Sequence, residues 1–191
     1  YYHRVAGVML PHLRGRPISM QRYPRGIGET GFYQKEVSDH FPEWIDTVPI
    51  YVEEEDAEQP QVVINNAATL VYLAGQGMIT PHVWLSRTDD LHAPDQLIFD
   101  LDPPQGEFET VRFAARVLRE TLEALGLVPF LKTTGSKGLH VLAPLERGPG
   151  FEATRTFARD LSDELVRRHP DRFTTEVRKN KREGRLFLDY L

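Results

Sequence analysis

The chain has 191 residues, a length typical of one domain, and 40% of them are apolar, enough for a hydrophobic core. It contains no cysteine, which excludes disulfides, thiolate nucleophiles and cysteine-ligated metal sites. It also contains no apolar run near the ~20 residues that a membrane span needs, and no signal peptide is visible. The net charge of −5 argues against a protein that binds nucleic acid through an overall basic character.

The charge is distributed unevenly along the chain. Residues 1–35 hold six basic residues and one acid, residues 36–109 hold one basic residue and sixteen acids, and residues 110–191 hold sixteen and eleven. These segments therefore carry net charges of +5, −15 and +5. Such a pattern is able to bring cations and anions together in space, although solvated surface charge explains most patterns of this kind. The acidic stretch 53–59 has no apolar anchor, and we expect it to be an exposed loop.

In the first half of the chain, apolar spacing and alternation predict two helices and several short strands. The predicted elements are helices over 1–14 and 66–75, the second capped by Asn66, and strands over 18–23, 31–35 and 45–52. His82 follows them, and we expect it in a loop.

The second half predicts a more regular order of elements. They are a strand over 96–102, a helix over 109–125, strands over 128–133 and 139–145, a helix over 151–168, and strands over 173–177 and 185–190. This β-α-β-β-α-β order with one further strand is that of the split-βαβ unit of ferredoxin-like and RNA-recognition-motif-like folds. In that topology the first and third strands are adjacent and antiparallel, so Asp100 and Asp102 are expected to face the segment 136–140.

Three carboxylates are candidate metal ligands. Residues i and i+2 of a strand share a face, so Asp100 and Asp102 point together while Leu101 points to the core. Two such carboxylates repel each other unless a cation lies between them, and oxygen ligands suit Mg²⁺ or Mn²⁺. Asp189 lies in an apolar strand, and we expect it to complete the site if that strand runs parallel to the first. The alternative is a pair of solvated acids at a strand end.

The segment 133–140, TTGSKGLH, is a candidate phosphate-binding loop. Backbone N–H groups freed by two glycines, together with Lys137, are able to bind phosphate, although the P-loop pattern is absent. The basic residues of 178–185 precede Asp189, and basic side chains beside a carboxylate metal site indicate a polyphosphate ligand. An ordinary hairpin turn with an exposed lysine is the alternative.

The motifs QLIFDLDPP, KTTGSKGLHVLAPL and KREGRLFLDYL closely resemble the three motifs of the polymerase domain of bacterial DNA ligase D, a member of the archaeo-eukaryotic primase superfamily. MLPHLRGRPISMQRYPRGI and GFYQK resemble its N-terminal region. The resemblance implies an α+β fold, with a split-βαβ catalytic core of the primase type and an N-terminal α/β extension. It implies one domain over 1–191, with a DNA-contacting part at 1–95 and a catalytic core at 96–191. Family segments that precede and follow this sequence are absent, so we expect a fragment of a longer domain.

The resemblance also implies roles for single residues. The positions that match the three catalytic, metal-binding aspartates of the family are Asp100, Asp102 and Asp189. Those expected to bind the incoming nucleotide are His82, Thr134, Ser136, Lys137, Gly138, His140 and Arg182. Lys35 matches a lysine that grips the 5′-phosphate of a downstream DNA strand.

The function implied by the resemblance is templated nucleotidyl transfer to a primer 3′-hydroxyl, with a preference for ribonucleotides, in gap filling and end extension during non-homologous end joining. The implied cofactors are two divalent ions, Mn²⁺ or Mg²⁺, with a nucleoside triphosphate as substrate. The implied partners are gapped or broken DNA with a 5′-phosphate, Ku and a DNA ligase, in the cytoplasm of a bacterium and at its nucleoid.

Three other interpretations compete with this one. IFDLD resembles the opening of the haloacid-dehalogenase phosphatases, but that family has a small residue and Thr where this chain has Pro103-Pro104. A DxD glycosyltransferase needs a sugar pocket, of which the sequence gives no sign. A non-catalytic module that binds DNA ends or 5′-phosphates would use the basic flanks and keep the acids for structure.

Overall fold

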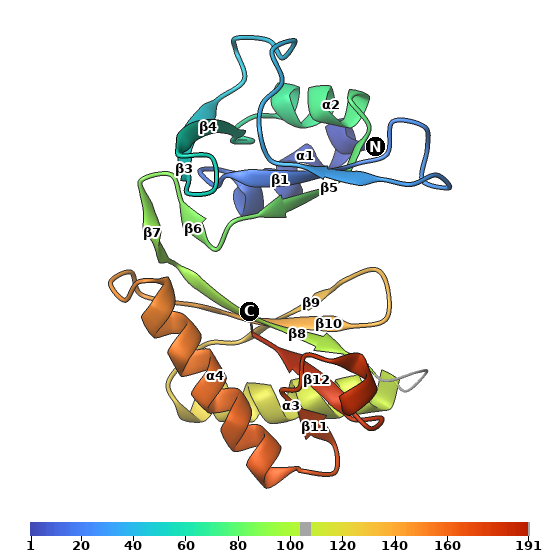
Figure 1. The fold of residues 1–191 in the computed structure, drawn as a ribbon, viewed down its shortest axis with the longest axis vertical. Helices are drawn as coiled ribbons and strands as arrows, with labels where there is room; N and C mark the ends of the chain where they lie inside the picture. The colour runs from blue at the N-terminus through green and yellow to red at the C-terminus, as the bar shows by residue number, and fades with distance from the viewer. Residues whose placement is uncertain (104–107, 191) are drawn as a thin grey trace. The chain divides into compact units, whose positions relative to one another are not determined.

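The computed structural model describes residues 1–103 and 108–190. The chain divides into two compact units, Tyr1–Leu91 and His92–Leu191, each of which combines helices with strands (Figure 1). The fold class is therefore mixed α+β. None of the described helices is both long and apolar enough to cross a membrane.

The first unit is built around a three-stranded antiparallel sheet in the order β2-β1-β5. Its elements are α1 (Tyr2–Leu13), β1 (Ile18–Arg22), β2 (Phe32–Gln34), β3 (Thr47–Val52), β4 (Ala57–Val62), α2 (Ala67–Gly75) and β5 (Met78–Val83). Strands β6 (Ser86–Arg87) and β7 (Asp90–Pro94) pair with each other, and β7 spans the point where the first unit ends. Ile18 and Leu70, neither of which is exposed, pack in one core with residues of α1 and β5. The predicted cap is confirmed, since the Asn66 side chain accepts a hydrogen bond from the Thr69 N–H at 2.9 Å.

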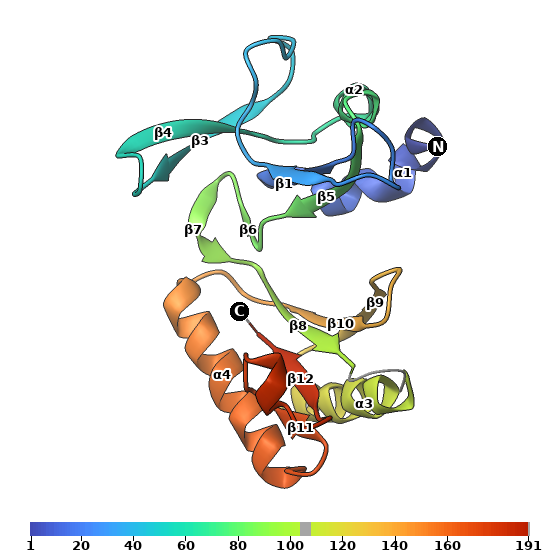
Figure 2. The same ribbon diagram turned by 45° about the vertical axis from the view of Figure 1, so that its right-hand side comes forward.

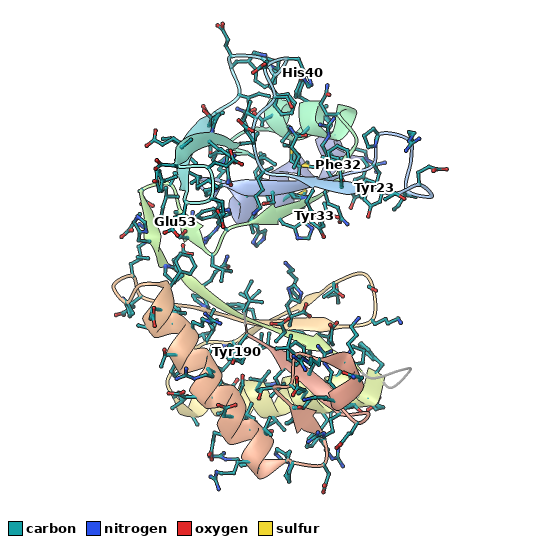
Figure 3. The ribbon with its side chains drawn as sticks, viewed as in Figure 1. Tyr23, Phe32, Tyr33, His40, Glu53 and Tyr190 are labelled. Atoms are coloured by element: carbon teal, nitrogen blue, oxygen red, sulfur yellow. The ribbon has the colours of Figure 1, made fainter. Side chains whose placement is uncertain are left out.

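Two predictions for this unit are wrong. His82 lies in strand β5, opposite Ser19 of β1, rather than in a loop. The acidic stretch 53–59 is exposed as predicted, but β4 begins at Ala57 and pairs with β3, so the stretch forms the end of a hairpin (Figure 3 labels Glu53). The sequence did not predict β4 because its first residues are polar or exposed on both faces, so they lack the apolar alternation typical of a half-buried strand.

Arg16, one of the six basic residues of 1–35, has a structural role. Its side chain is only 6% exposed, and its Nη1 donates to the carbonyl oxygens of Trp84, Leu85 and Ser86 at 3.2, 3.0 and 3.3 Å. A buried guanidinium needs such acceptors, because an unpaired charge in the interior is costly. Charge counted from sequence therefore overstates the basic surface of this segment.

The second unit is a five-stranded sheet in the order β11-β12-β8-β10-β9. Its elements are β8 (Gln96–Asp102), α3 (Phe108–Ala124), β9 (Phe130–Thr133), β10 (Leu139–Pro144), α4 (Phe151–Arg168), β11 (Phe173–Thr174), a 3-10 turn (Lys179–Lys181) and β12 (Leu186–Asp189). The first and third strands, β8 and β10, are adjacent and antiparallel, as the predicted topology required. β12 runs antiparallel to β8, so the parallel arrangement set as a condition for Asp189 is wrong.

Helices α3 and α4 cover one face of this sheet, as Figure 2 shows. On β8, Leu97, Phe99 and Leu101 point into that core and are 3%, 0% and 0% exposed. The intervening residues, which include Asp100 and Asp102, point to the other face and are partly or fully exposed. The two-residue period of the strand therefore places both carboxylates on the face away from the helices.

Candidate functional site

Cross-strand register places four polar residues in one row on the face of the second unit's sheet that points away from α3 and α4. Asp189 of β12 lies opposite Asp100 of β8, Asp100 lies opposite His140 of β10, and His140 lies opposite Lys132 of β9. Directly opposed residues share a face of the sheet. The row therefore crosses four strands and joins two of the candidate aspartates with the candidate histidine.

Asp102 lies on the same face as Asp100, two residues along β8, and is opposite Phe187. Over the described residues, no three His, Asp or Glu side chains converge closely enough to hold a metal ion. The donor set nevertheless fits a hard divalent cation, because all three candidates offer carboxylate oxygens on one face. Directly opposed Cβ atoms lie about 5 Å apart, a separation that a cation between the Asp100 and Asp189 carboxylates can bridge.

His140 contacts the centre of this row. Its Nε2 lies 3.5 Å from Oδ1 of Asp100, and the two side chains are 23% and 42% exposed. Its Nδ1 is buried and has no hydrogen-bond partner among the described residues. A buried polar atom without a partner is unfavourable, so this imidazole favours a polar ligand atom beside it.

The loop after β9 is stabilised by hydrogen bonds within it and packs against β8. The hydroxyl of Thr134 donates to the Gly138 carbonyl at 3.0 Å and accepts from the Ser136 N–H at 3.4 Å. Gly135 has a positive φ of 77°, a conformation that favours glycine. A Cβ added to Gly138 would lie 2.5 Å from the carbonyl oxygen of Leu101, so a side chain at that position would push the loop away from the aspartates.

A pocket of about 440 Å³ lies beside this loop and is strongly basic. Its lining residues are Asp102, Pro103, Lys137, Lys179, Arg182, Gly184 and Arg185. One carboxylate among four cationic side chains makes the pocket suited to an anion, with Asp102 at its border.

Arg182 is fixed in this pocket by three contacts. Its Nε and Nη2 donate to the carbonyl oxygens of Glu176 and Val177 at 3.0 and 2.9 Å, and its guanidinium carbon lies 3.9 Å from the centre of the Phe187 ring. These contacts preorganise the side chain, so little conformational freedom remains to be lost when an anion binds.

The remaining two predicted site residues, His82 and Lys35, belong to the first unit. The exposed His82 ring lies 5.3 Å from the ring of Tyr33 on β2, which Figure 3 labels. Lys35 follows β2 directly and is exposed. The other predicted site residues all lie in the second unit.

The structure adds residues that sequence reasoning missed. Lys132 joins the polar row and Phe187 supports Arg182. Lys179 and Arg185, which line the basic pocket, belong instead to the basic residues of 178–185 that the sequence already singled out. The sequence held one signal for Lys132. It stands two residues before Thr134 at the end of a predicted strand, and alternate residues of a strand share a face. Its place in the row depends on register, which a single sequence does not specify.

Comparison with known proteins identifies the family of the chain. The family model for the LigD primase-polymerase domain matches residues 1–191. The multifunctional non-homologous end joining protein LigD of Pseudomonas aeruginosa is 35% identical over 193 residues, which cover all of this chain and 23% of that protein. The bifunctional LigD of Bacillus subtilis is 30% identical, with 100% of this chain and 30% of that protein covered.

A solved structure agrees with this result. The polymerase domain of Mycobacterium tuberculosis ligase D, determined in complex with DNA, matches with a TM-score of 0.92 and 30% identity over all of this chain and 69% of that one. The chain spans about a quarter of the length of the curated relatives named above. The chain belongs to the primase-polymerase domain family of LigD.

Proposed function

We propose that the chain catalyses templated nucleotidyl transfer to the 3′-hydroxyl of a DNA primer. The observation that carries the proposal is the row Asp189–Asp100–His140, with Asp102 between this row and a basic pocket. Carboxylates beside an anion pocket meet the demands of phosphoryl transfer, which are mainly positioning and electrostatic stabilisation. We infer that the second unit is the split-βαβ catalytic core, since its last strand lies beside its first and its third beside its second.

The oxygen donors of Asp100, Asp102 and Asp189 are assigned to two divalent ions, Mg²⁺ or Mn²⁺. When bound, such ions lower the pKa of the attacking hydroxyl and neutralise charge on the leaving pyrophosphate. Asp100 and Asp189 hold their carboxylates on opposed positions of two strands, and Asp102 reaches toward the basic pocket that it lines. Backbone pairing of β8 with β12 thus sets the distance between the ligands.

The basic pocket is assigned to the triphosphate of the incoming nucleotide. Lys137 lines the pocket from the loop after β9, and Arg182 is held there by the carbonyls of Glu176 and Val177. Ser136 and Gly138, in the same loop, offer backbone N–H groups to the phosphates. His140 lies beside Asp100, with its Nε2 3.5 Å from Oδ1 of that residue. These groups neutralise the phosphates and orient the reacting phosphorus.

Ribonucleotide preference is assigned to the Thr134 side of the loop. The Thr134 hydroxyl already donates to Gly138, but a hydroxyl oxygen has two lone pairs and is able to accept from a 2′-hydroxyl as well. His82 and Lys35, in the first unit, are assigned to the nucleotide and to the 5′-phosphate of a downstream strand. Residues 1–95 would then contact DNA while 96–191 catalyse.

The biological setting follows from the relatives. They are non-homologous end joining proteins of bacteria, and the solved relative is a polymerase domain bound to DNA. We assign this chain to gap filling and end extension in the same process, at the bacterial nucleoid, with Ku and a DNA ligase as partners. Arg182 and Lys137 favour this assignment over a non-catalytic DNA-end module, which has no need of a triphosphate pocket.

A primer-extension assay tests the proposal. The chain is incubated with a gapped duplex that carries a 5′-phosphate, with ribonucleotides or deoxyribonucleotides, and with Mn²⁺, Mg²⁺ or EDTA. We expect extension by templated nucleotides with either metal and none with EDTA, and faster extension with ribonucleotides. Metal-independent binding of the gapped DNA without extension would identify an end-binding module instead.

A further inference from the structure

A second pocket in the second unit lies on the side of the sheet opposite the Asp100 row. It has a volume of about 540 Å³ and is enclosed by one face of α3 and by strands β9 and β10. Leu139 and Val141 of β10, which contribute to its floor, also belong to the core between sheet and helices, whereas His140 between them points to the other face. The pocket is therefore separate from the proposed catalytic site.

The apolar part of this pocket is exposed to an unusual degree. Leu131 of β9, opposite Val141 of β10, points into it and is 61% exposed, whereas Phe130, opposite Leu142, points to the other face of the sheet and is 54% exposed. Over the described residues, β9 pairs with β10 on one side and with no strand on the other. In such an edge strand, alternate N–H and C=O groups point outward without a partner strand. Exposed apolar side chains on an unpaired strand edge are the features that accept an added strand.

Three arginines line the helical wall of the pocket at a spacing of four and three residues. Arg112 forms an ion pair with Glu109 at 2.5 Å, and Arg119 forms one with Glu123 at 2.8 Å. Arg116, between them on the same face, makes no hydrogen bond or ion pair with another residue of the described chain. The pocket thus offers one uncommitted guanidinium above an apolar floor, which suits a ligand with an isolated carboxylate beside apolar groups.

We propose that this pocket binds an extended acidic segment of a partner protein. The segment adds a strand to the free edge of β9, places its apolar side chains beside Phe130 on one face of the sheet, and directs the alternating carboxylates to Arg116 on the other. Aliphatic side chains dominate the floor, and glutamates neutralise the two outer arginines. Single-stranded nucleic acid asks instead for a continuous basic groove with stacked aromatic rings.

Fluorescence anisotropy of synthetic probes against the whole chain tests this proposal. The probes are a peptide of alternating valine and glutamate, its valine–lysine counterpart, and oligo(dT). We expect the glutamate peptide to bind more tightly than the other two, and Arg116→Glu to lower its affinity at least about tenfold, the equivalent of 1.4 kcal/mol. Arg155→Glu, on an exposed position of α4, is the matched control and should leave the affinity unchanged.

A backbone readout separates strand addition from charge attraction alone. Saturation with the glutamate peptide should slow amide hydrogen exchange in Phe130–Thr133, and Leu131→Asp should abolish both binding and protection while primer extension persists. Equal affinity for the two peptides, no binding of either, or no effect of Arg116→Glu would overturn the proposal. Arg116-dependent binding of oligo(dT) in preference to the glutamate peptide would instead make the pocket a nucleic-acid surface.

Discussion

Asp100 and Asp189 lie directly opposite each other on antiparallel strands, although 88 residues separate them in sequence. Their backbones are joined by the β8–β12 ladder, so the distance between the carboxylates is set by secondary structure rather than by a flexible loop. Two anions held in this way repel each other in the absence of a cation. A divalent cation between two opposed carboxylates would offset such repulsion, as the proposed metal site requires.

This relationship predicts the effect of neutral substitutions on metal binding. Asp100→Asn and Asp189→Asn should each weaken Mn²⁺ binding by at least about tenfold, because each removes one charged oxygen ligand from a shared site. Isothermal titration with Mn²⁺ measures the effect. Asp160→Asn, an exposed acid of α4 paired with Arg159, is the control and should bind Mn²⁺ like the parent chain. Unchanged affinity in Asp189→Asn would remove that residue from the metal site.

Gly138→Ala should destabilise the second unit and reduce extension. The added Cβ would meet the Leu101 carbonyl at 2.5 Å, and displacement of the loop or of β8 should cost about 1–3 kcal/mol of unfolding free energy. Urea unfolding measures this change. Gly28→Ala is the matched control, because no atom lies within 4 Å of the position that its added methyl group would take and its φ is ordinary. Equal stabilities of the two variants would show that the loop yields without strain.

Arg182→Lys should raise the KM for nucleoside triphosphate by about tenfold, which corresponds to 1.4 kcal/mol. Lysine has no planar fork with which to bond both carbonyls, and it loses the face-on contact with Phe187. Steady-state extension at varied nucleotide concentration measures the KM. Arg172→Lys, at an arginine stacked on Phe113 at 4.4 Å outside the pocket, should leave the KM unchanged. A similar rise in both variants would point to a general loss of stability.

Lys35→Ala should weaken binding to gapped DNA that carries a 5′-phosphate by about tenfold, the value of one charge-assisted hydrogen bond. Because Lys35 is exposed, its truncation should leave the fold and its stability unchanged. Electrophoretic mobility of gapped duplexes measures the affinity, with a 5′-hydroxyl gap as the internal control. An equal loss on both duplexes would exclude a specific contact between Lys35 and the phosphate.

Glu164 on α4 should contribute to the stability of the fold in a pH-dependent way. Hydrogen bonds from Arg167 and then Arg168 lower its pKa below the ordinary value. A carboxyl whose pKa is lower in the folded state stabilises the fold above its unfolded pKa of about 4.3, and that contribution is lost as pH falls through the folded pKa. Glu164→Gln should therefore lower the Tm at neutral pH, and the difference from the parent should vanish in acid. A difference that persists unchanged at low pH would contradict the linkage.

The second unit is largely predictable because its helices and strands have strong apolar periodicity. The pattern over 151–168 predicts both ends of α4, and the alternation of β8 places Asp100 and Asp102 on one face. Strand β5 escapes prediction because its Pro81 and exposed His82 interrupt the apolar pattern. The hydrogen bonds of β1, which provides the partner strand, override that local signal.

The pairing of strands that are distant in sequence is what a single sequence does not specify. The direction of β12 and the register that sets Asp189 opposite Asp100 depend on pairing across the sheet, not on local pattern. The same limit applies to charge, since Arg16 is buried against three carbonyls while Arg116 is exposed and uncommitted. Composition weighs both arginines equally, although their environments differ.

Asp100, Asp102 and Asp189 should support a metal-dependent nucleotidyl transfer. Single-turnover primer extension with Mn²⁺, by the parent chain, Asp100→Ala and Asp160→Asn, tests this most directly, with DNA binding measured in parallel. We expect the parent and Asp160→Asn to extend the primer at the same rate, and Asp100→Ala to bind DNA but to lose at least about two orders of magnitude in rate. Extension by Asp100→Ala at the parental rate would contradict the metal-dependent role of these carboxylates.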